Sequence, residues 1–311
     1  ASLLAATNTF ALDLDPALPA YQTVSGIAGN LKAVGSDTLN NLMAYWAEGF
    51  KARYPNVKIA VEGKGSSTAA PALIESTAQF GPMSREMKPT EIDAFERKFG
   101  YKPSMIRVAV DALAVFVHKD NPVACLTLKQ LDAMFSSTRK GGAPGPITRW
   151  GQVGLTGKWK DMPISLYGRN AASGTYGFFK AVALFGGDFK NSVKEQPGSS
   201  SVVQGEASGK NAIGYSGVGY RTADVRAVPL AAEPGKCYPA TAEAAYAGDY
   251  PLARFLFIYV NKNPSRPLDP LISEFVKFVL SKEGQLAVIK EGFFPVSKAL
   301  ADKDMAALGI R

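Results

Sequence analysis

Three turns of this chain carry small hydroxyl residues where a predicted strand passes into a predicted helix. The most informative turn follows a predicted strand at 162–167 and reads Arg169-Asn170-Ala171-Ala172-Ser173-Gly174-Thr175. An arginine offers a planar fork of donors that matches the oxygens of a tetrahedral oxyanion. The hydroxyls add donors, Gly174 permits close approach of the backbone, and a helix N-terminus has free N–H groups and a positive dipole end. The turn favours an anion, although a capped helix beside a surface arginine would give the same pattern.

The same arrangement occurs twice upstream. Gly35-Ser36-Asp37-Thr38 follows a predicted strand at 31–34, and Gly65-Ser66-Ser67-Thr68 follows an alternating strand at 57–61. The first of these turns precedes a helix with apolar residues at helical spacing, for which Asp37 or Thr38 is a suitable N-cap. One such turn is weak support for a ligand site. Three of them, one with an arginine, predict a shared oxyanion site.

Composition and motifs exclude several other classes of function. The chain has 311 residues, 46% of them hydrophobic, and is long enough for two domains. Its net charge of +8 comes from scattered lysines and arginines without a nucleic-acid motif, so no nucleic-acid partner is expected. A single histidine, His118, and two cysteines give little basis for a metal cluster or a Ser-His-Asp site. We therefore expect no catalytic residues, no metal and no cofactor.

Two further features bear on where the protein works. The two cysteines, Cys125 and Cys237, suit either buried thiols or one disulfide, and the sequence does not choose between them. The N-terminal segment 1–11 is small and apolar, like the end of a secretory signal with a cleavage site near Ala11. The longest apolar stretch, 108–117, is too short to span a bilayer. The expectation is an exported protein.

Along the chain, strands and helices alternate in two blocks, 30–110 and 126–250, which indicates α/β structure with mostly parallel sheets. An unusually long extended run at 107–117 and a second one at 252–260 could cross between two domains. Helical patterns at 270–280 and 284–291 close the chain.

Several short motifs together resemble the periplasmic phosphate-binding proteins that deliver phosphate to bacterial ABC importers. The resemblance covers about residues 30–300, and the order and spacing of its motifs are more specific than any one of them. The motifs are Gly35-Ser36-Asp37-Thr38-Leu39, Gly65-Ser66-Ser67, Phe80-Gly81-Pro82-Met83-Ser84, Arg169 with Ser173-Gly174-Thr175, Ile213-Gly214-Tyr215, Tyr250-Pro251-Leu252, and Gly284-Gln285 with Gly292-Phe293-Phe294-Pro295.

The resemblance implies a two-lobed receptor, each lobe a mostly parallel sheet flanked by helices, joined by two extended crossings near Asp111 and Leu252. It implies an irregular lead-in at 1–29, lobe 1 at 30–111 plus 252–311, and lobe 2 at 112–251. The receptor would be a monomer that binds inorganic phosphate reversibly between its lobes and delivers it to the membrane permease of an ABC importer, in the periplasm. The implied ligand-binding residues are Ser36, Asp37, Thr38, Leu39 through its backbone, Ser66, Ser84, Arg169, Ser173, Gly174 and Thr175.

Two positions depart from the family pattern. Many members have an aspartate at the position of Ser84, where it accepts the proton of phosphate, and some have one at the position of Ala171, where it braces the arginine. Phosphate near neutral pH carries a proton that it can donate to a carboxylate, whereas sulfate has none and would be repelled. We infer that Asp37 takes the acceptor role and that it is also a suitable partner for Arg169. The alternative is that Asp37 is only a helix cap.

Other functions remain open. A receptor for sulfate, molybdate or another oxyanion would have the same donors without the carboxylate. A phosphate-ester hydrolase could use Ser66 or Ser173 as its nucleophile, but the sequence offers no evident base or metal set for it. A surface adhesin that keeps the receptor fold is a further possibility.

Overall fold

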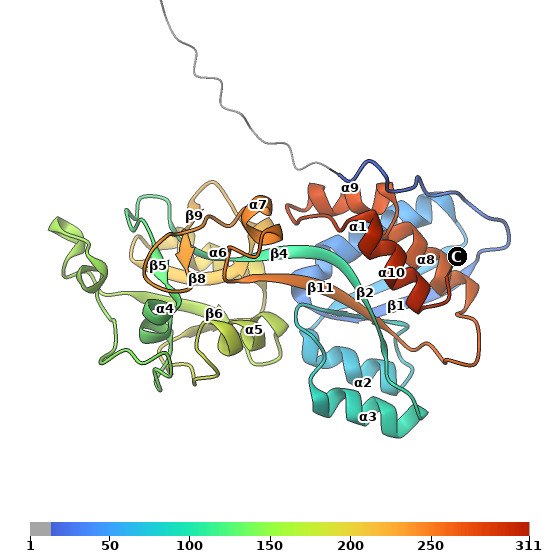
Figure 1. The fold of residues 1–311 in the computed structure, drawn as a ribbon, viewed down its shortest axis with the longest axis horizontal. Coiled ribbons are helices and arrows are strands. Elements are labelled where there is room, and N and C mark those ends of the chain that lie inside the picture. The colour runs from blue at the N-terminus through green and yellow to red at the C-terminus, as the bar shows by residue number, and fades with distance from the viewer. Residues whose placement is uncertain (1–13, 311) are drawn as a thin grey trace, which may run out of the picture.

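Two lobes lie side by side and are joined by two long strands in the computed structural model of the protein, which describes residues 14–310 (Figure 1). The predicted signal-like segment, with its cleavage site near Ala11, lies outside the described residues. The joining strands are β4 (Ser104–His118) and β11 (Ala253–Val260). They are the two extended runs that the sequence predicted as crossings.

The lobe that holds the chain's first strands is called lobe 1 below. Its strands β1, β2 and β3 lie at one end of a nine-stranded sheet, in which eight strands follow the order β2-β1-β3-β11-β4-β8-β6-β7 and the ninth, β9, pairs with β4 outside this order. Its strands are β1 (Gly29–Gly35), β2 (Val57–Gly63) and β3 (Phe80–Met83). Its helices are α1 (Asn40–Arg53), α2 (Ala69–Ile74), α3 (Pro89–Phe99), α8 (Pro270–Val279), α9 (Lys282–Lys290) and α10 (Lys298–Ala307). Helices α2 and α3 pack on one face of the sheet, and α1, α8 and α9 pack on the other.

The other lobe, called lobe 2, contains the strands β6 (Ser165–Arg169), β7 (Lys194–Gln196), β8 (Ala212–Gly217) and β9 (Val225–Ala227), and a small sheet of β5 (Leu126–Thr127) with β10 (Leu230–Ala231). Its helices are α4 (Leu128–Phe135), α5 (Gly174–Val182), α6 (Ser199–Ser208) and α7 (Ala242–Tyr246). Short 3₁₀ helices complete the chain at Asp37–Leu39, Ser66–Thr68, Trp150–Val153, Gly157–Trp159 and Val218–Tyr220.

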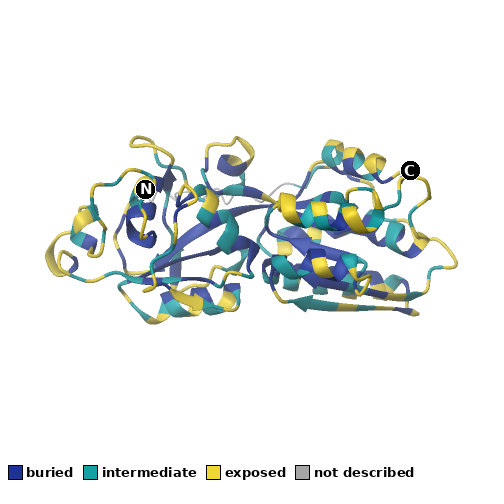
Figure 2. Cartoon of the chain, turned by 90° about the horizontal axis from the view of Figure 1, so that it is seen from below, coloured by how far each residue is buried: buried dark blue, intermediate teal, exposed yellow. Residues whose placement is uncertain are grey.

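Strand β4 belongs to both lobes, which explains its length. Residues 104–112 pair antiparallel with β11, and residues 113–118 pair antiparallel with β8 and β9. In lobe 2 its side chains alternate between two cores. Leu113, Val115 and Val117 face α4 and α5, whereas Ala114 and Phe116 face α6. Because both faces are covered, the strand is mostly apolar, and residues 108–117 are buried (Figure 2).

Strand β11 also pairs antiparallel with β3. Apart from the pairs that β4 and β11 form, the strands of each lobe pair in parallel, as the sequence predicted: β1 with β2 and β3, and β6 with β7 and β8. The predicted lobe boundaries at 111/112 and 251/252 lie inside β4 and just before β11. The assignment of 30–111 plus 252–311 to lobe 1 and 112–251 to lobe 2 remains a prediction, and we use it as the proposed division of the chain.

Two local predictions were wrong. The strand expected at 162–167 begins later, at Ser165, and runs on to Arg169; Pro163, which has no N–H to donate, precedes it. Asp37 and Thr38 do not cap α1: they lie in the 3₁₀ turn, and Leu39 is the residue before α1. The helix α10 had no counterpart among the predicted elements.

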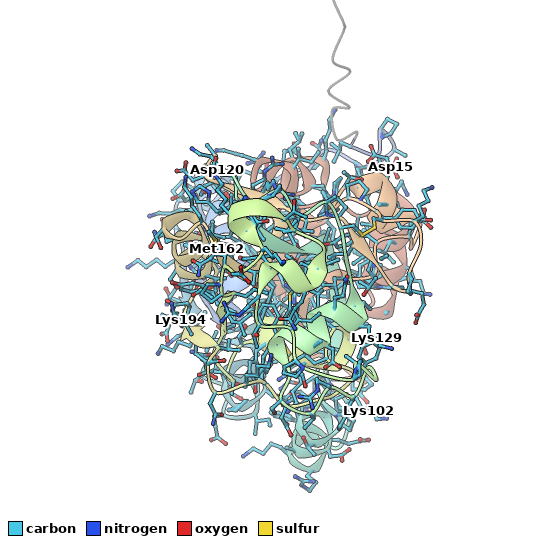
Figure 3. The ribbon with its side chains drawn as sticks, turned by 90° about the vertical axis from the view of Figure 1, so that its left-hand side faces the viewer. Asp15, Lys102, Asp120, Lys129, Met162 and Lys194 are labelled. Atoms are coloured by element: carbon cyan, nitrogen blue, oxygen red, sulfur yellow. A yellow bond between two sulfur atoms is a disulfide. The ribbon has the colours of Figure 1, made fainter. Side chains whose placement is uncertain are left out.

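Cys125 and Cys237 are joined in a disulfide, which decides the question that the sequence left open. Their Cα atoms lie 6.2 Å apart, within the usual range for such a bond. The disulfide links the residue before β5 to the segment that follows its partner strand β10, at the end of lobe 2 seen in Figure 3. Lys129 and Lys194 are exposed at the periphery of the same view, so the charged groups of these two side chains face solvent at this end of lobe 2.

One carboxyl group in lobe 2 is buried without a partner. Glu206, on α6, has no hydrogen-bond partner for either carboxylate oxygen among the described residues. It fits against Gly214 of β8, where an added Cβ would come within 2.0 Å of Glu206 Oε1. Burial raises the pKa of Glu206 well above its ordinary value of 4.5. At pH values between the unfolded and the folded pKa of Glu206, the folded protein therefore holds a proton at this site that the unfolded chain releases.

We expect Glu206→Gln to stabilise the protein in a pH-dependent way. A carboxyl whose folded pKa is raised contributes most favourably below its unfolded pKa, and stability is lost as the pH rises above about 4.5. The variant should exceed the wild type by about 1 kcal/mol or more in unfolding free energy near pH 8, and by little near pH 4. Urea denaturation at the two pH values measures this difference. The exposed Glu48→Gln is the control, and an equal effect of Glu206→Gln at both pH values would contradict the explanation.

Candidate functional site

The three turns predicted to carry hydroxyls meet where the lobes touch. Ser36 donates a hydrogen bond to Ser84 Oγ at 3.0 Å, and Ser66 Oγ lies 3.3 Å from Ser84 Oγ, all within lobe 1. Across the lobes, Thr38 Oγ1 lies 2.9 Å from Thr175 Oγ1, and Ser84 Oγ lies 3.4 Å from Thr175 Oγ1. All of these side chains are buried. We call these five residues the hydroxyl cluster.

Arg169 lies at the end of β6 and is 1% exposed. Its Nη1 donates to Ser199 Oγ at 2.8 Å and its Nη2 to the Pro197 carbonyl at 3.1 Å. Its Nε is buried and has no acceptor among the described residues. Burial lowers the pKa of Arg169 and the carboxylate of Asp37 opposes that shift. A buried guanidinium with an unused N–H can donate a charge-assisted hydrogen bond to an anion.

Asp37 contacts Arg169 from the opposite lobe. Its Oδ2 lies 3.3 Å from Arg169 Nη2 and accepts a hydrogen bond from Ser199 N at 2.8 Å. Asp37 is therefore bonded to a helix N-terminus, but to that of α6 in lobe 2 rather than to that of its own helix. Its side chain is 25% exposed, and Oδ1 has no hydrogen-bond partner within residues 14–310. Oδ1 is therefore free to accept a hydrogen bond from a protonated ligand.

The first turn of α5 is arranged for close approach to lobe 1. Ser173 caps the helix and accepts hydrogen bonds from Thr175 N at 3.1 Å and Tyr176 N at 3.4 Å, so part of the expected free N–H groups is already used. A Cβ added at Gly174 would come within 2.2 Å of Ser66 Oγ. Glycine is therefore required at this position when the lobes are in contact.

Further hydrogen bonds between the lobes surround the hydroxyl cluster. Ser67 N and Oγ both donate to the Ala172 carbonyl, at 3.1 and 3.0 Å. The Tyr220 hydroxyl donates to the carbonyls of Asp37 and Thr38, both at 3.1 Å. The structure is thus the closed arrangement, in which each predicted turn touches the facing lobe.

Sequence reasoning missed an arginine of this region. Arg254, on β11, is 7% exposed, and its Nη2 donates to Thr175 Oγ1 at 3.0 Å and to Asp111 Oδ2 at 2.8 Å. Arg254 is the basic residue in the apolar run 252–260, and Asp111 is the acidic residue in the apolar run 107–117. Lone opposite charges in two buried strands were the signal that could have indicated the pair. Ser199 was also missed, as was Tyr220, whose hydroxyl contacts the Asp37 and Thr38 carbonyls.

Other residues lie outside this region. The Leu39 side chain is buried in the lobe 1 core, so only its backbone can face a ligand. Arg85 donates to both carboxylate oxygens of Glu91 at 2.7 Å, so its charge is paired within lobe 1. Tyr215 stacks on Phe179 with ring centroids 3.9 Å apart, and its hydroxyl accepts a hydrogen bond from Arg169 N at 3.2 Å, so it supports the site from behind.

A cavity of about 780 Å³ lies beside β4 and β11, the strands that form the hinge between the lobes. Of the residues described so far in this subsection, only Arg254 lines it. The polar groups at its wall are already bonded: Asp15 accepts from Ala17 N and Lys298 N, and Ser297 caps α10. The described residues contain no group of side chains suited to a metal ion. We therefore take the hydroxyl cluster with Arg169 and Asp37 as the candidate ligand site.

This site offers hydrogen-bond donors from several hydroxyls and from Arg169, and one free carboxylate oxygen from Asp37. It lies where the two lobes meet in the closed form. Within the described part of the chain, no helix is long and apolar enough to cross a membrane. A two-lobed α/β fold with its polar site at the lobe junction defines the class of solute-binding receptors. In such proteins the ligand contacts both lobes and closure depends on it.

Comparison with known proteins gives the family. Residues 20–283 match the family model described as the PBP superfamily domain. The chain is 55% identical over 298 residues to the phosphate-binding protein PstS of Pseudomonas aeruginosa, covering 96% of this chain and 92% of that protein. It is 29% identical to the PstS of Staphylococcus epidermidis, over 84% of this chain and 77% of that one.

A solved structure of similar fold is a putative phosphate ABC transporter substrate-binding protein from Clostridium perfringens with bound phosphate. Its TM-score is 0.73 at 27% identity, covering 86% of this chain and all of that one. A possible phosphate-binding protein from Planctomyces limnophilus has a TM-score of 0.66 at 27% identity, covering 91% and 99%. The chain belongs to the PBP superfamily and, within it, to the PstS family of phosphate-binding proteins.

Proposed function

We propose that the protein binds inorganic phosphate reversibly between its lobes and delivers it to the membrane permease of an ABC importer. The observation that carries this proposal is the buried Nε of Arg169, which has no acceptor among residues 14–310, beside a cluster of buried hydroxyls from both lobes. An unpaired buried donor costs roughly 1–3 kcal/mol, and an anion bound beside the Nε–H of Arg169 would supply the acceptor that it lacks. The names of the relatives support phosphate as that anion.

We propose the whole predicted set as phosphate ligands: Ser36, Asp37, Thr38, the backbone of Leu39, Ser66, Ser84, Arg169, Ser173, Gly174 and Thr175. Because the set is divided between lobes, the closed form gains contacts that the open form lacks, and phosphate shifts the population toward closure. The permease would then recognise the closed form. This function implies a periplasmic, monomeric receptor that carries out no chemistry on its ligand.

Isothermal titration of the wild type with phosphate and with sulfate tests the proposal. We expect phosphate to bind and an equal concentration of sulfate not to bind. Tight binding of sulfate alone would make the protein a receptor for that oxyanion. Turnover of a phosphate ester would support the hydrolase, and absence of oxyanion binding would support the adhesin.

Selectivity is expected to depend on Asp37, because it supplies the free carboxylate oxygen that Ser84 cannot supply. Asp37→Asn should weaken phosphate binding by about tenfold, because the carboxylate acceptor is lost. The variant should also show a smaller preference for phosphate over sulfate, since the amide can donate to a fully ionised oxyanion. Titration of the variant with both anions measures the change. Asp188→Asn is the control, since that carboxylate is exposed and pairs with Lys180. Unchanged selectivity in Asp37→Asn would rule out the acceptor role.

A further inference from the structure

Arg254 occupies an unusual place between the hinge and the site. On paired strands it lies directly opposite Asp111, so both strands that join the lobes carry one member of the ion pair. Its Nε and Nη2 donate to Asp111 Oδ2 at 3.0 and 2.8 Å. Asp111 is fully buried, and its Oδ1 accepts from Val218 N at 3.0 Å. The positive charge is therefore balanced inside the hinge, and the pair adds no net charge for attracting an anion.

The remaining donors of Arg254 reach both lobes. Nη1 donates to the Ser84 carbonyl in lobe 1 at 2.7 Å, and Nη2 donates to Thr175 Oγ1 in lobe 2 at 3.0 Å. The guanidinium plane is rigid, so these bonds form together only when the two turns stand at their closed separation. Arg254 thus contacts the hinge, the turn after β3 and the first turn of α5 at once.

The bond to Thr175 also determines how that hydroxyl behaves. A hydroxyl has one proton to donate, and an oxygen that accepts from a guanidinium directs its own proton elsewhere. The neighbouring hydroxyls are held in the same way, because Ser66 Oγ accepts from Ser84 N at 3.1 Å and Ser173 Oγ accepts from Thr175 N. Each of these hydroxyls therefore keeps its own proton available for donation. Thr175 is the one whose donor state depends on the hinge.

We propose that Arg254 is a positioning residue of the anion site, which holds the Thr175 hydroxyl as a donor and links it to Ser84 in the closed form. This inference rests on the proposed binding of an oxyanion by the hydroxyl cluster. It assigns Arg254 a role through Thr175 and Ser84, without direct contact with the ligand. The Arg254–Asp111 pair would thereby link the closure of the two lobes to the hydrogen bonds made with the anion.

A double-mutant cycle tests this role. Arg254→Met is combined with Asp111→Asn, so that no buried carboxylate is left without a partner, and is measured with and without Thr175→Val. We expect Asp111→Asn with Arg254→Met to weaken phosphate binding about tenfold or more in the wild-type background, and less than about threefold when Thr175 is already valine. Asp111→Asn alone, which keeps the donors of Arg254, should weaken it less than the pair.

Equal losses in both backgrounds would show that Arg254 acts independently of Thr175 and would overturn the proposal, as would unchanged affinity in the wild-type background. Circular dichroism and thermal unfolding establish that each variant folds. If the paired variant does not fold, the cycle is run with Arg254→Lys, which keeps the charge but cannot reach all three partners. If the wild type binds sulfate instead of phosphate, the proposed ligand is wrong, and the same cycle with sulfate still tests Arg254.

Discussion

Arg169→Ala is expected to reduce phosphate affinity by roughly 100- to 10,000-fold, because about two charge-assisted hydrogen bonds of roughly 1.5–3 kcal/mol each are lost. The reason is the local geometry. Arg169 is 1% exposed, and its Nε–H has no acceptor among the described residues, so its charge is presented in a site with little competing water. Isothermal titration with phosphate measures the loss. Sulfate or any other oxyanion that binds should lose affinity equally, because the guanidinium does not distinguish protonated from ionised anions.

Two comparisons separate loss of a ligand contact from loss of structure. Arg266→Ala removes an exposed arginine from lobe 1 and should leave affinity unchanged. Arg169→Lys keeps a charge without the planar fork and should recover only part of the affinity. Arg169→Ala also removes the cation beside Asp37, but Ser199 N still donates to that carboxylate, so the fold is expected to persist. An alanine variant that is folded and binds phosphate with wild-type affinity would refute the site assignment.

The sequence predicted the parts of this site that depend on local pattern. A Gly-Ser-Asp-Thr or Ser-Gly-Thr segment after a strand is visible in the sequence, because turn chemistry and helix starts use neighbouring residues. The two extended runs were also visible as crossings, since a strand covered on both faces is continuously apolar. Thr38, Ser66 and Thr175 could therefore be selected from the sequence alone.

The sequence predicted one contact between the lobes, the pairing of Asp37 with Arg169, but missed others that depend on how the lobes meet. Asp37 was weighed otherwise as a cap of its own helix, because capping is a local rule, whereas its carboxylate bonds the N-terminus of α6. Arg254 and Asp111 are separated by 143 positions and become neighbours only through the register of β4 with β11. No local rule indicates such a pair, although the isolated charges in apolar strands were a usable signal.

Gly174→Ala is expected to block closure while leaving each lobe intact. An added Cβ would lie 2.2 Å from Ser66 Oγ, 2.7 Å from Ser84 Oγ and 2.8 Å from Ser66 Cβ. Rotation of the serine hydroxyl could relieve the first contact but not the third, so the lobes must separate. In the open form the same methyl group meets solvent, and alanine in the first turn of a helix is favourable by up to about 1 kcal/mol relative to glycine.

Thermal stability of Gly174→Ala without phosphate should therefore equal or exceed that of the wild type, whereas phosphate affinity should fall by roughly 30- to 1000-fold as hydrogen bonds across the cleft worth about 2–4 kcal/mol are lost. Small-angle scattering should show that phosphate compacts the wild type and not the variant. Gly177→Ala, one turn further along α5, is the matched control. There an added Cβ lies 3.3 Å from Arg85 Cδ, in a flexible side chain that can move. Full affinity and normal compaction in Gly174→Ala would mean that the anion is held without the lobe contact seen here, and would separate ligand binding from closure.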